Sequence, residues 1–159
     1  MPLAEDLLAQ ALLLVNKEPK KPKDASLRRA VSTAYYALFH LLIQEACAKW
    51  SHVGSRQYLA RSFEHKVMKD ACTAAENASH PPTVPTATIT KLRSVARAFR
   101  ELQQARHLAD YSYATQWDRV KALAKVTQAQ TAFTDWKAIR SDDLAQRYLA
   151  TLLSRYNEW

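Results

Sequence analysis

The sequence predicts an all-α protein, and three observations carry this prediction. The chain has 159 residues, which suits a single domain with one hydrophobic core. Gly54 is its one glycine, whereas β-hairpins and phosphate-binding turns depend on glycine for backbone conformations with positive φ. Apolar residues recur at steps of three and four over long stretches, as on one face of an α-helix. We therefore expect a bundle of five to six helices in which neighbours along the chain run antiparallel.

The helices in the first half of the chain are delimited by residues that start or exclude a helix. Pro2 suits a first helical position, and the prolines of the basic linker 16–23 break the chain after it. Asp24 or Ser26 can cap the second helix through a side-chain oxygen, and the segment 51–54 ends it. The helices of this half are predicted over residues 2–15, 24–49 and 55–76.

The second half is delimited in the same way. Three prolines within residues 80–85 exclude a helix there, and Thr88 supplies a capping hydroxyl for the next one. The Ser-Asp-Asp sequence at 141–143 can satisfy the free amides that begin the last helix. The helices of this half are predicted over residues 88–110, 115–139 and 141–156, with a short segment at 111–114. Only surface loops separate these elements, so residues 1–159 are expected to form a single domain.

Composition narrows the class of partner. The chain has 23 lysine and arginine residues against 15 acidic ones, a formal charge of +8, which favours polyanionic partners and nucleic acid first. No apolar run is long enough to cross a membrane, and the acidic start does not resemble a targeting peptide, so a cytoplasmic protein without membrane contact is expected. Cys47 and Cys72 form no CxxC pair, so neither a zinc site nor a redox motif is expected.

Arg106 interrupts the apolar face of the helix predicted over 88–110. A buried guanidinium without a partner is costly, and Asp110, four residues on, can supply one. The pair can be a structural ion pair that closes the helix end. Alternatively, Arg106 is held in a cleft for a phosphate, whose oxygens match the guanidinium fork. The other residues of this face are Leu92, Val95, Phe99, Leu102 and Ala109.

The adjoining face of the same helix carries a row of basic and polar residues. Like charges four residues apart repel each other, so an offset is expected from acids on a neighbouring helix or from an anionic ligand. A face that is simply solvated is the alternative. The row consists of Arg93, Arg97, Arg100, Gln104, His107 and Tyr111.

Two further stripes supply polar candidates. Arg29, Tyr36 and His40 follow one another along one side of the helix 24–49, and His65 lies on one side of the helix 55–76. Each also fits a half-buried rim whose polar tips stay in water.

Three segments together resemble HEPN-domain proteins. Residues 26–40 (SLRRAVSTAYYALFH) resemble the second-helix signature of this family, and residues 61–69 (RSFEHKVMK) are similar to a helix-3 segment of one bacterial branch. Residues 106–111 (RHLADY) resemble the Arg-x-x-Ala-Asp-Tyr motif of the same branch. The resemblance covers most of residues 24–140.

The resemblance implies an up-and-down helical bundle that is usually a homodimer, with the paired motifs of two subunits lining a cleft. Many members are metal-independent ribonucleases, and many are toxins paired with a nucleotidyltransferase antitoxin. In the nuclease members four to six residues separate an arginine from a histidine. The arginine holds the scissile phosphate, and the histidine moves protons during attack by the ribose 2′-hydroxyl. Some carry a tyrosine seven residues after the arginine, which the partner enzyme modifies, and Tyr113 falls at that position.

The sequence departs from the nuclease pattern after Arg106. Tyr111 and Ser112 lie five and six residues on, and no histidine occurs in this window. A tyrosine titrates near 10, far from the neutral optimum of a general base. His107 directly follows the arginine and points about 100° away around the helix.

Three functions are therefore compatible with the residues. The first is a HEPN-type protein with a degenerate nuclease motif that binds RNA, a nucleotide or a nucleotidyltransferase partner, in a toxin–antitoxin or defence context. The second is an active metal-independent endoribonuclease toxin in which Tyr111, His65 or His40 transfers protons. The third is a structural dimeric adaptor. The candidate catalytic residues are Arg106, Asp110, Tyr111 and His65, and the candidate nucleic-acid- or nucleotide-binding residues are Arg29, Tyr36, His40, Arg97, Arg100 and Tyr113; no metal ligand and no cofactor is expected.

Overall fold

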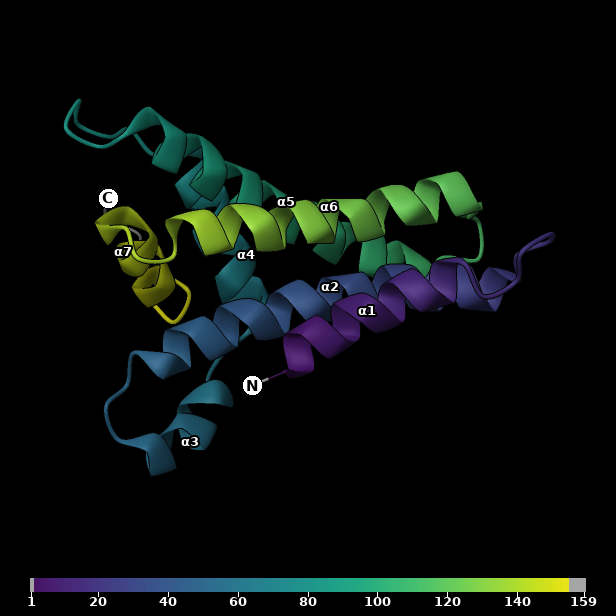
Figure 1. The fold of residues 1–159 in the computed structure, drawn as a ribbon, viewed down its shortest axis with the longest axis horizontal. Helices are drawn as coiled ribbons and strands as arrows, with labels where there is room; N and C mark the ends of the chain where they lie inside the picture. Colours follow the sequence, from purple (N-terminus) through teal and green to yellow (C-terminus); the bar gives the residue numbers. More distant parts are fainter. Residues whose placement is uncertain (1, 155–159) are drawn as a thin grey trace.

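Two helices, α2 and α5, form the centre of the protein, and the other elements pack around them (Figure 1). The computed structural model describes residues 2–154, whose regular secondary structure is helical without any strand, so the all-α prediction is confirmed. Their elements are α1 (Leu3–Val15), α2 (Asp24–Ala48), the 3₁₀ turn η1 (Val53–Ser55), α3 (Arg56–Ala60), α4 (His65–Asn77), α5 (Thr86–Tyr111), α6 (Arg119–Ile139) and α7 (Asp143–Thr151).

The arrangement is a helical bundle with additions at one end. Figure 1 shows α1 and α2 as a hairpin joined by the linker 16–23, with α6 beside both and α5 packed against α2 and α6. α4 packs on α5, α7 closes one end against α2, α4 and α5, and α3 extends from the end of α2. The largest fully buried side chains are Trp136, Tyr35, Tyr148 and Phe99.

The predicted helix over 55–76 is wrong, because the chain turns at residues 61–64 and divides it into α3 and α4. Glu64 adopts an extended conformation (φ −113°, ψ 131°), the Phe63 side chain is buried, and His65 begins α4. No proline or glycine marks this turn in the sequence. Tertiary contacts of Phe63 and His65 therefore outweigh the local helical preference.

Several predicted helix ends shift for identifiable reasons. α6 begins at Arg119 rather than 115, because the Asp118 carboxylate accepts a hydrogen bond from the Lys121 amide (2.8 Å) and caps the helix there. α5 begins at Thr86, and Thr88 donates to Asp142 (2.6 Å) instead of capping its own helix. The predicted end of the last helix near 156 lies outside the described residues.

The cap predicted for α2 is also wrong. Lys23 occupies the N-cap position and provides no side-chain hydrogen bond, so neither Asp24 nor Ser26 caps the helix. The Ser26 hydroxyl instead donates to the Glu18 carboxylate of the linker (2.9 Å), which ties the linker to the start of α2.

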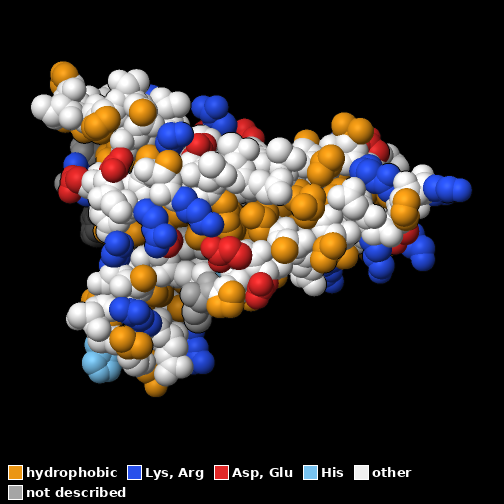
Figure 2. All heavy atoms as spheres, viewed as in Figure 1, with side chains coloured by type: hydrophobic (Ala, Val, Ile, Leu, Met, Phe, Trp, Pro, Cys, Tyr) orange, Lys and Arg blue, Asp and Glu red, His pale blue; other side chains and the backbone are white. Residues whose placement is uncertain are grey.

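Part of the molecular surface is apolar. Figure 2 shows hydrophobic side chains gathered over α1 and α6. None of the helices in residues 2–154 combines the length and apolar character needed to cross a lipid bilayer. The exposed large apolar residues of α1 and α6 are Leu3, Leu12, Leu13, Val120 and Leu123.

Candidate phosphate-binding site

Arg106 lies on α5 with its side chain only 15% exposed, at the border between the core and the surface. Its guanidinium carbon is 5.4 Å from the centre of the Tyr35 ring and 5.6 Å from that of Tyr36, both on α2. The faces of aromatic rings attract cations, which offsets part of the cost of removing the guanidinium from water. The structure therefore holds a cation on an otherwise apolar face of α5.

The ion pair between Arg106 and Asp110 is loose. Arg106 Nη1 lies 3.8 Å from Asp110 Oδ2, and that same oxygen accepts a hydrogen bond from the Ser32 hydroxyl (3.2 Å). Arg106 Nε is buried and has no hydrogen-bond partner among residues 2–154. A guanidinium has five N–H donors, and at 3.8 Å Asp110 makes no hydrogen bond to it, so the donors that face the groove of Arg106 remain available to an additional acceptor.

Arg106 lines a groove between α4 and α5 with a volume of about 320 Å³. Every lining side chain can donate hydrogen bonds, and none is a carboxylate. Lys66 pairs with Asp70 on its own helix at 3.3 Å, but both side chains are exposed, so this ion pair contributes little to stability. A groove with this composition has a positive potential that favours anions. The lining residues are Lys66, Lys69, Gln103, Gln104, Arg106 and His107.

Tyr35 contacts both Arg106 and His65 and so connects them. The Tyr35 hydroxyl is 2.5 Å from His65 Nδ1, and the His65 ring stacks on Phe39 with centroids 4.3 Å apart. Gln103 donates from Nε2 to the His65 carbonyl (3.3 Å), which joins the start of α4 to α5. The turn at 61–64 thus places the imidazole within the aromatic cluster of α2.

The electrostatics of this cluster favour neutral side chains around one fixed cation. Burial lowers the pKa of His65, and the positive charge of Arg106 lowers it further, as does His40 when it is protonated. Burial also lowers the pKa of His40 and raises that of Tyr35 far above its usual value. Near pH 7, His65 is therefore a neutral imidazole and Tyr35 is a phenol.

The structure brings only some of the predicted site residues together. Tyr36 lies under Arg106, Asp110 pairs with it, and His65 is joined to it through Tyr35. His40 contacts the cluster through Phe39, with ring centroids 5.4 Å apart.

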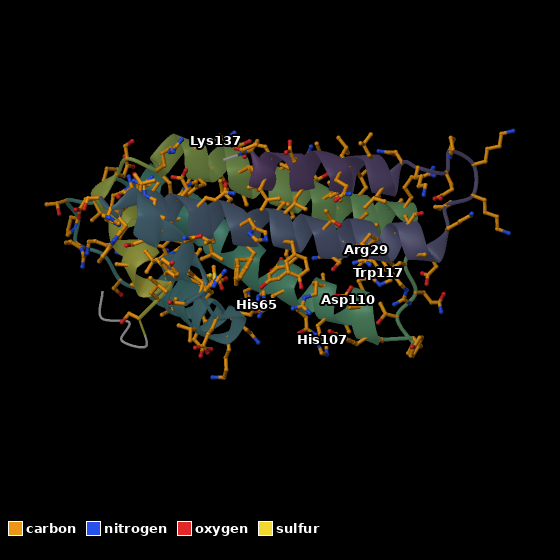
Figure 3. All side chains as sticks on the ribbon, turned by 90° about the horizontal axis from the view of Figure 1, so that it is seen from below. Arg29, His65, His107, Asp110, Trp117 and Lys137 are labelled. Atoms are coloured by element: carbon orange, nitrogen blue, oxygen red, sulfur yellow. The ribbon has the colours of Figure 1, made fainter. Side chains whose placement is uncertain are left out.

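The remaining candidates lie on the surface or have other partners. Arg29 is exposed on α2, Tyr113 is 97% exposed beyond the end of α5, and Tyr111 is 65% exposed with its ring against His107. Figure 3 shows His65, His107 and Asp110 on one side of the molecule and Lys137 on the other.

The basic row of α5 is offset by an acid on a neighbouring helix. Arg97 Nε and Arg100 Nε lie 3.3 and 2.7 Å from the carboxylate of Glu76 on α4. Their hydrogen bonds and charges hold the pKa of Glu76 below its usual range. Arg93 donates to the Ala78 carbonyl at 2.7 Å. These arginines thus attach α4 to α5 and do not line the groove of Arg106.

Several residues of this site were not predicted from the sequence. Tyr35 lies on the buried stripe of α2, where an aromatic residue is expected for packing alone. Lys66 and Lys69 lie three residues apart and so share a face of α4, a signal that the sequence did contain. Among the described residues no group of three histidine, cysteine or carboxylate side chains could hold a metal ion.

The chain matches no family model, no curated protein and no solved structure. Membership of the HEPN family therefore stays a prediction from the motifs within residues 24–140.

Proposed function

We propose that this protein is a HEPN-type helical protein with a degenerate nuclease motif. It binds a phosphate group of RNA or of a nucleotide at Arg106. One observation carries the proposal. A largely buried guanidinium, whose ion pair with Asp110 is long (3.8 Å), lies in a groove whose lining contains two lysines and no carboxylate. On this proposal the protein acts in a toxin–antitoxin or defence context, as a homodimer and with a nucleotidyltransferase partner.

The chemistry of the groove fits a phosphate. An arginine can offer two parallel N–H donors to two oxygens of one phosphate, whereas Lys66 and Lys69 act as point charges that attract a polyanion. Asp110 is the competing anion. Its carboxylate is shared with Ser32 and lies 3.8 Å from the guanidinium, so a phosphate can bind without first breaking a short ion pair.

Replacing Arg106 with glutamine is the direct test. We expect the affinity for a short single-stranded RNA, measured by fluorescence anisotropy, to fall by about 10- to 100-fold, because charge-assisted hydrogen bonds contribute about 1.5–3 kcal/mol each. Lys137→Gln is the matched control, because it removes one positive charge from the opposite side of the molecule (Figure 3). Circular dichroism of both variants establishes that the helices remain folded.

Equal affinities in the two variants would contradict a specific phosphate site and leave only long-range attraction by the positive chain. An unchanged affinity in Arg106→Gln would leave the Arg106–Asp110 pair with a purely structural role.

A second candidate function, a metal-independent endoribonuclease, is favoured by the position of His65. A neutral imidazole close to a phosphate-binding arginine can accept the proton of a ribose 2′-hydroxyl as its oxygen attacks phosphorus. The bond from phosphorus to the 5′-oxygen then breaks, the leaving oxygen takes a proton from water, and Arg106 neutralises the charge that develops on the phosphate oxygens.

For this candidate we expect RNA cleavage in the presence of EDTA, read from end-labelled RNA on a denaturing gel. His65→Asn should reduce the rate by about 100-fold or more while RNA affinity changes little, since a general base contributes roughly 10²–10⁴-fold. Intact RNA after prolonged incubation with the unmodified protein excludes this candidate and leaves binding at Arg106 unaffected.

A further inference from the structure

An exposed aromatic pair lies beside the groove of Arg106. The rings of His107 and Tyr111 are 5.2 Å apart and inclined at 52°. His107 lines the groove, and Tyr111 lies one helical turn further along α5 with 65% of its surface exposed. Neither ring belongs to the hydrophobic core, so packing does not explain the pair.

The backbone that carries the two rings is fixed. Four residues advance an α-helix by about 6 Å, so Tyr111 lies about that far along the axis from His107. A single nucleotide can span this distance. Arg28 binds the carbonyls of the last turn of α5 and of the segment that follows it, which holds the Tyr111 backbone in place. Rings presented on a rigid element lose little conformational freedom when a ligand stacks on them.

A second groove adjoins the groove of Arg106. It lies between α5 and α6, has a volume of about 330 Å³, and includes Gln104, which also lines the groove of Arg106. Trp117 contributes an aromatic surface to it. Its charged lining residues are three cations and one carboxylate: Arg100, Lys121, Lys125 and Glu101. The two grooves thus meet at Gln104, one helical turn before His107 on α5, and both contain cationic side chains.

We propose that His107 and Tyr111 form a stacking subsite for an unpaired nucleobase, on a single-stranded nucleic acid whose phosphate is held at Arg106. The inference rests on the proposed phosphate site and names the class of ligand that the site takes. A base that stacks on these rings must be free of its complementary strand, which disfavours a duplex. The second groove receives the continuing strand, so several nucleotides bind better than one.

The experiment compares two probes, a short single-stranded oligonucleotide and an abasic strand of the same length that keeps the sugars and phosphates. Tyr111→Ala is expected to weaken binding of the base-bearing strand by roughly 10-fold, because stacking of one base on an aromatic side chain contributes substantially to affinity. Binding of the abasic strand should stay within about twofold of the unmodified protein. Tyr111→Phe keeps the ring and should retain the affinity for both strands.

Tyr58→Ala is the matched control, because Tyr58 is 64% exposed on α3 and lines neither groove. The stacking subsite is overturned if Tyr111→Ala leaves the affinity for the base-bearing strand unchanged, or if it weakens both strands equally. It is also overturned if a duplex of the same length binds as tightly as the single strand.

These outcomes are distinct from failure of the phosphate site. If both strands bind equally and lose affinity together in Arg106→Gln, the phosphate site stands and the stacking subsite does not. If neither strand binds, both proposals fail.

Discussion

Replacing Arg28 with leucine is expected to lower the free energy of unfolding by about 2–4 kcal/mol, since each buried acceptor that loses its partner costs about 1–3 kcal/mol. Arg28 Nη1 donates to the carbonyls of Ala109 (3.0 Å) and Ser112 (2.8 Å), and Nη2 donates to that of Thr115 (2.9 Å). The side chain is 20% exposed, so water replaces these bonds only in part. Its charge also lies at the negative end of the α5 dipole.

Arg29→Leu is the control for this prediction, because the neighbouring arginine is exposed on the same helix and the same atoms are removed. Chemical denaturation should place Arg29→Leu within about 0.5 kcal/mol of the unmodified protein, as is usual for surface substitutions. Amide hydrogen exchange in the last turn of α5 should accelerate only in Arg28→Leu. Similar losses in the two variants would contradict a role of Arg28 in holding the helix end.

Replacing Trp136 with alanine is expected to cost about 3–5 kcal/mol, the range for large-to-small changes of buried aromatic residues. Trp136 is fully buried on α6, and its ring lies 6.1 Å from that of Tyr148 on α7, centroid to centroid. The substitution therefore leaves a cavity where α7 closes the bundle. Urea denaturation monitored by circular dichroism measures the change.

Trp136→Phe separates packing from hydrogen bonding. The indole nitrogen is buried without a hydrogen-bond partner among the described residues, so phenylalanine removes no hydrogen bond and keeps most of the ring. We expect this variant to lose less than half as much stability as Trp136→Ala. Equal losses would mean that the indole nitrogen has a stabilising contact.

Local patterns predicted the helices but not how the chain turns between α3 and α4. Proline-rich linkers and three- to four-residue spacing are local signals, and the long helices follow them. The turn before His65 depends on Phe63 entering the core and on the hydrogen bond to Tyr35, thirty positions earlier in the chain. Contacts of this kind are set by tertiary packing, which local propensity does not encode.

The candidate site was predictable in its centre and not in its surroundings. An arginine on an apolar helix face is visible in the sequence, and Arg106 was identified in this way. The partner of Arg97 and Arg100 was not, because Glu76 meets them only once α4 packs on α5. The same packing assembles the groove, whose lysines come from α4 and whose glutamines come from α5.

The Glu76 carboxylate, shared by two guanidinium groups, has a consequence for the kinetics of binding. Because it joins α4 to α5 independently of Arg106, both walls of the groove are held together without an anion. Preorganised sites avoid the entropic penalty of ordering their walls during association. A polyanion can then bind without a prior rearrangement of the helices, and long-range attraction by the positively charged chain sets the rate of association.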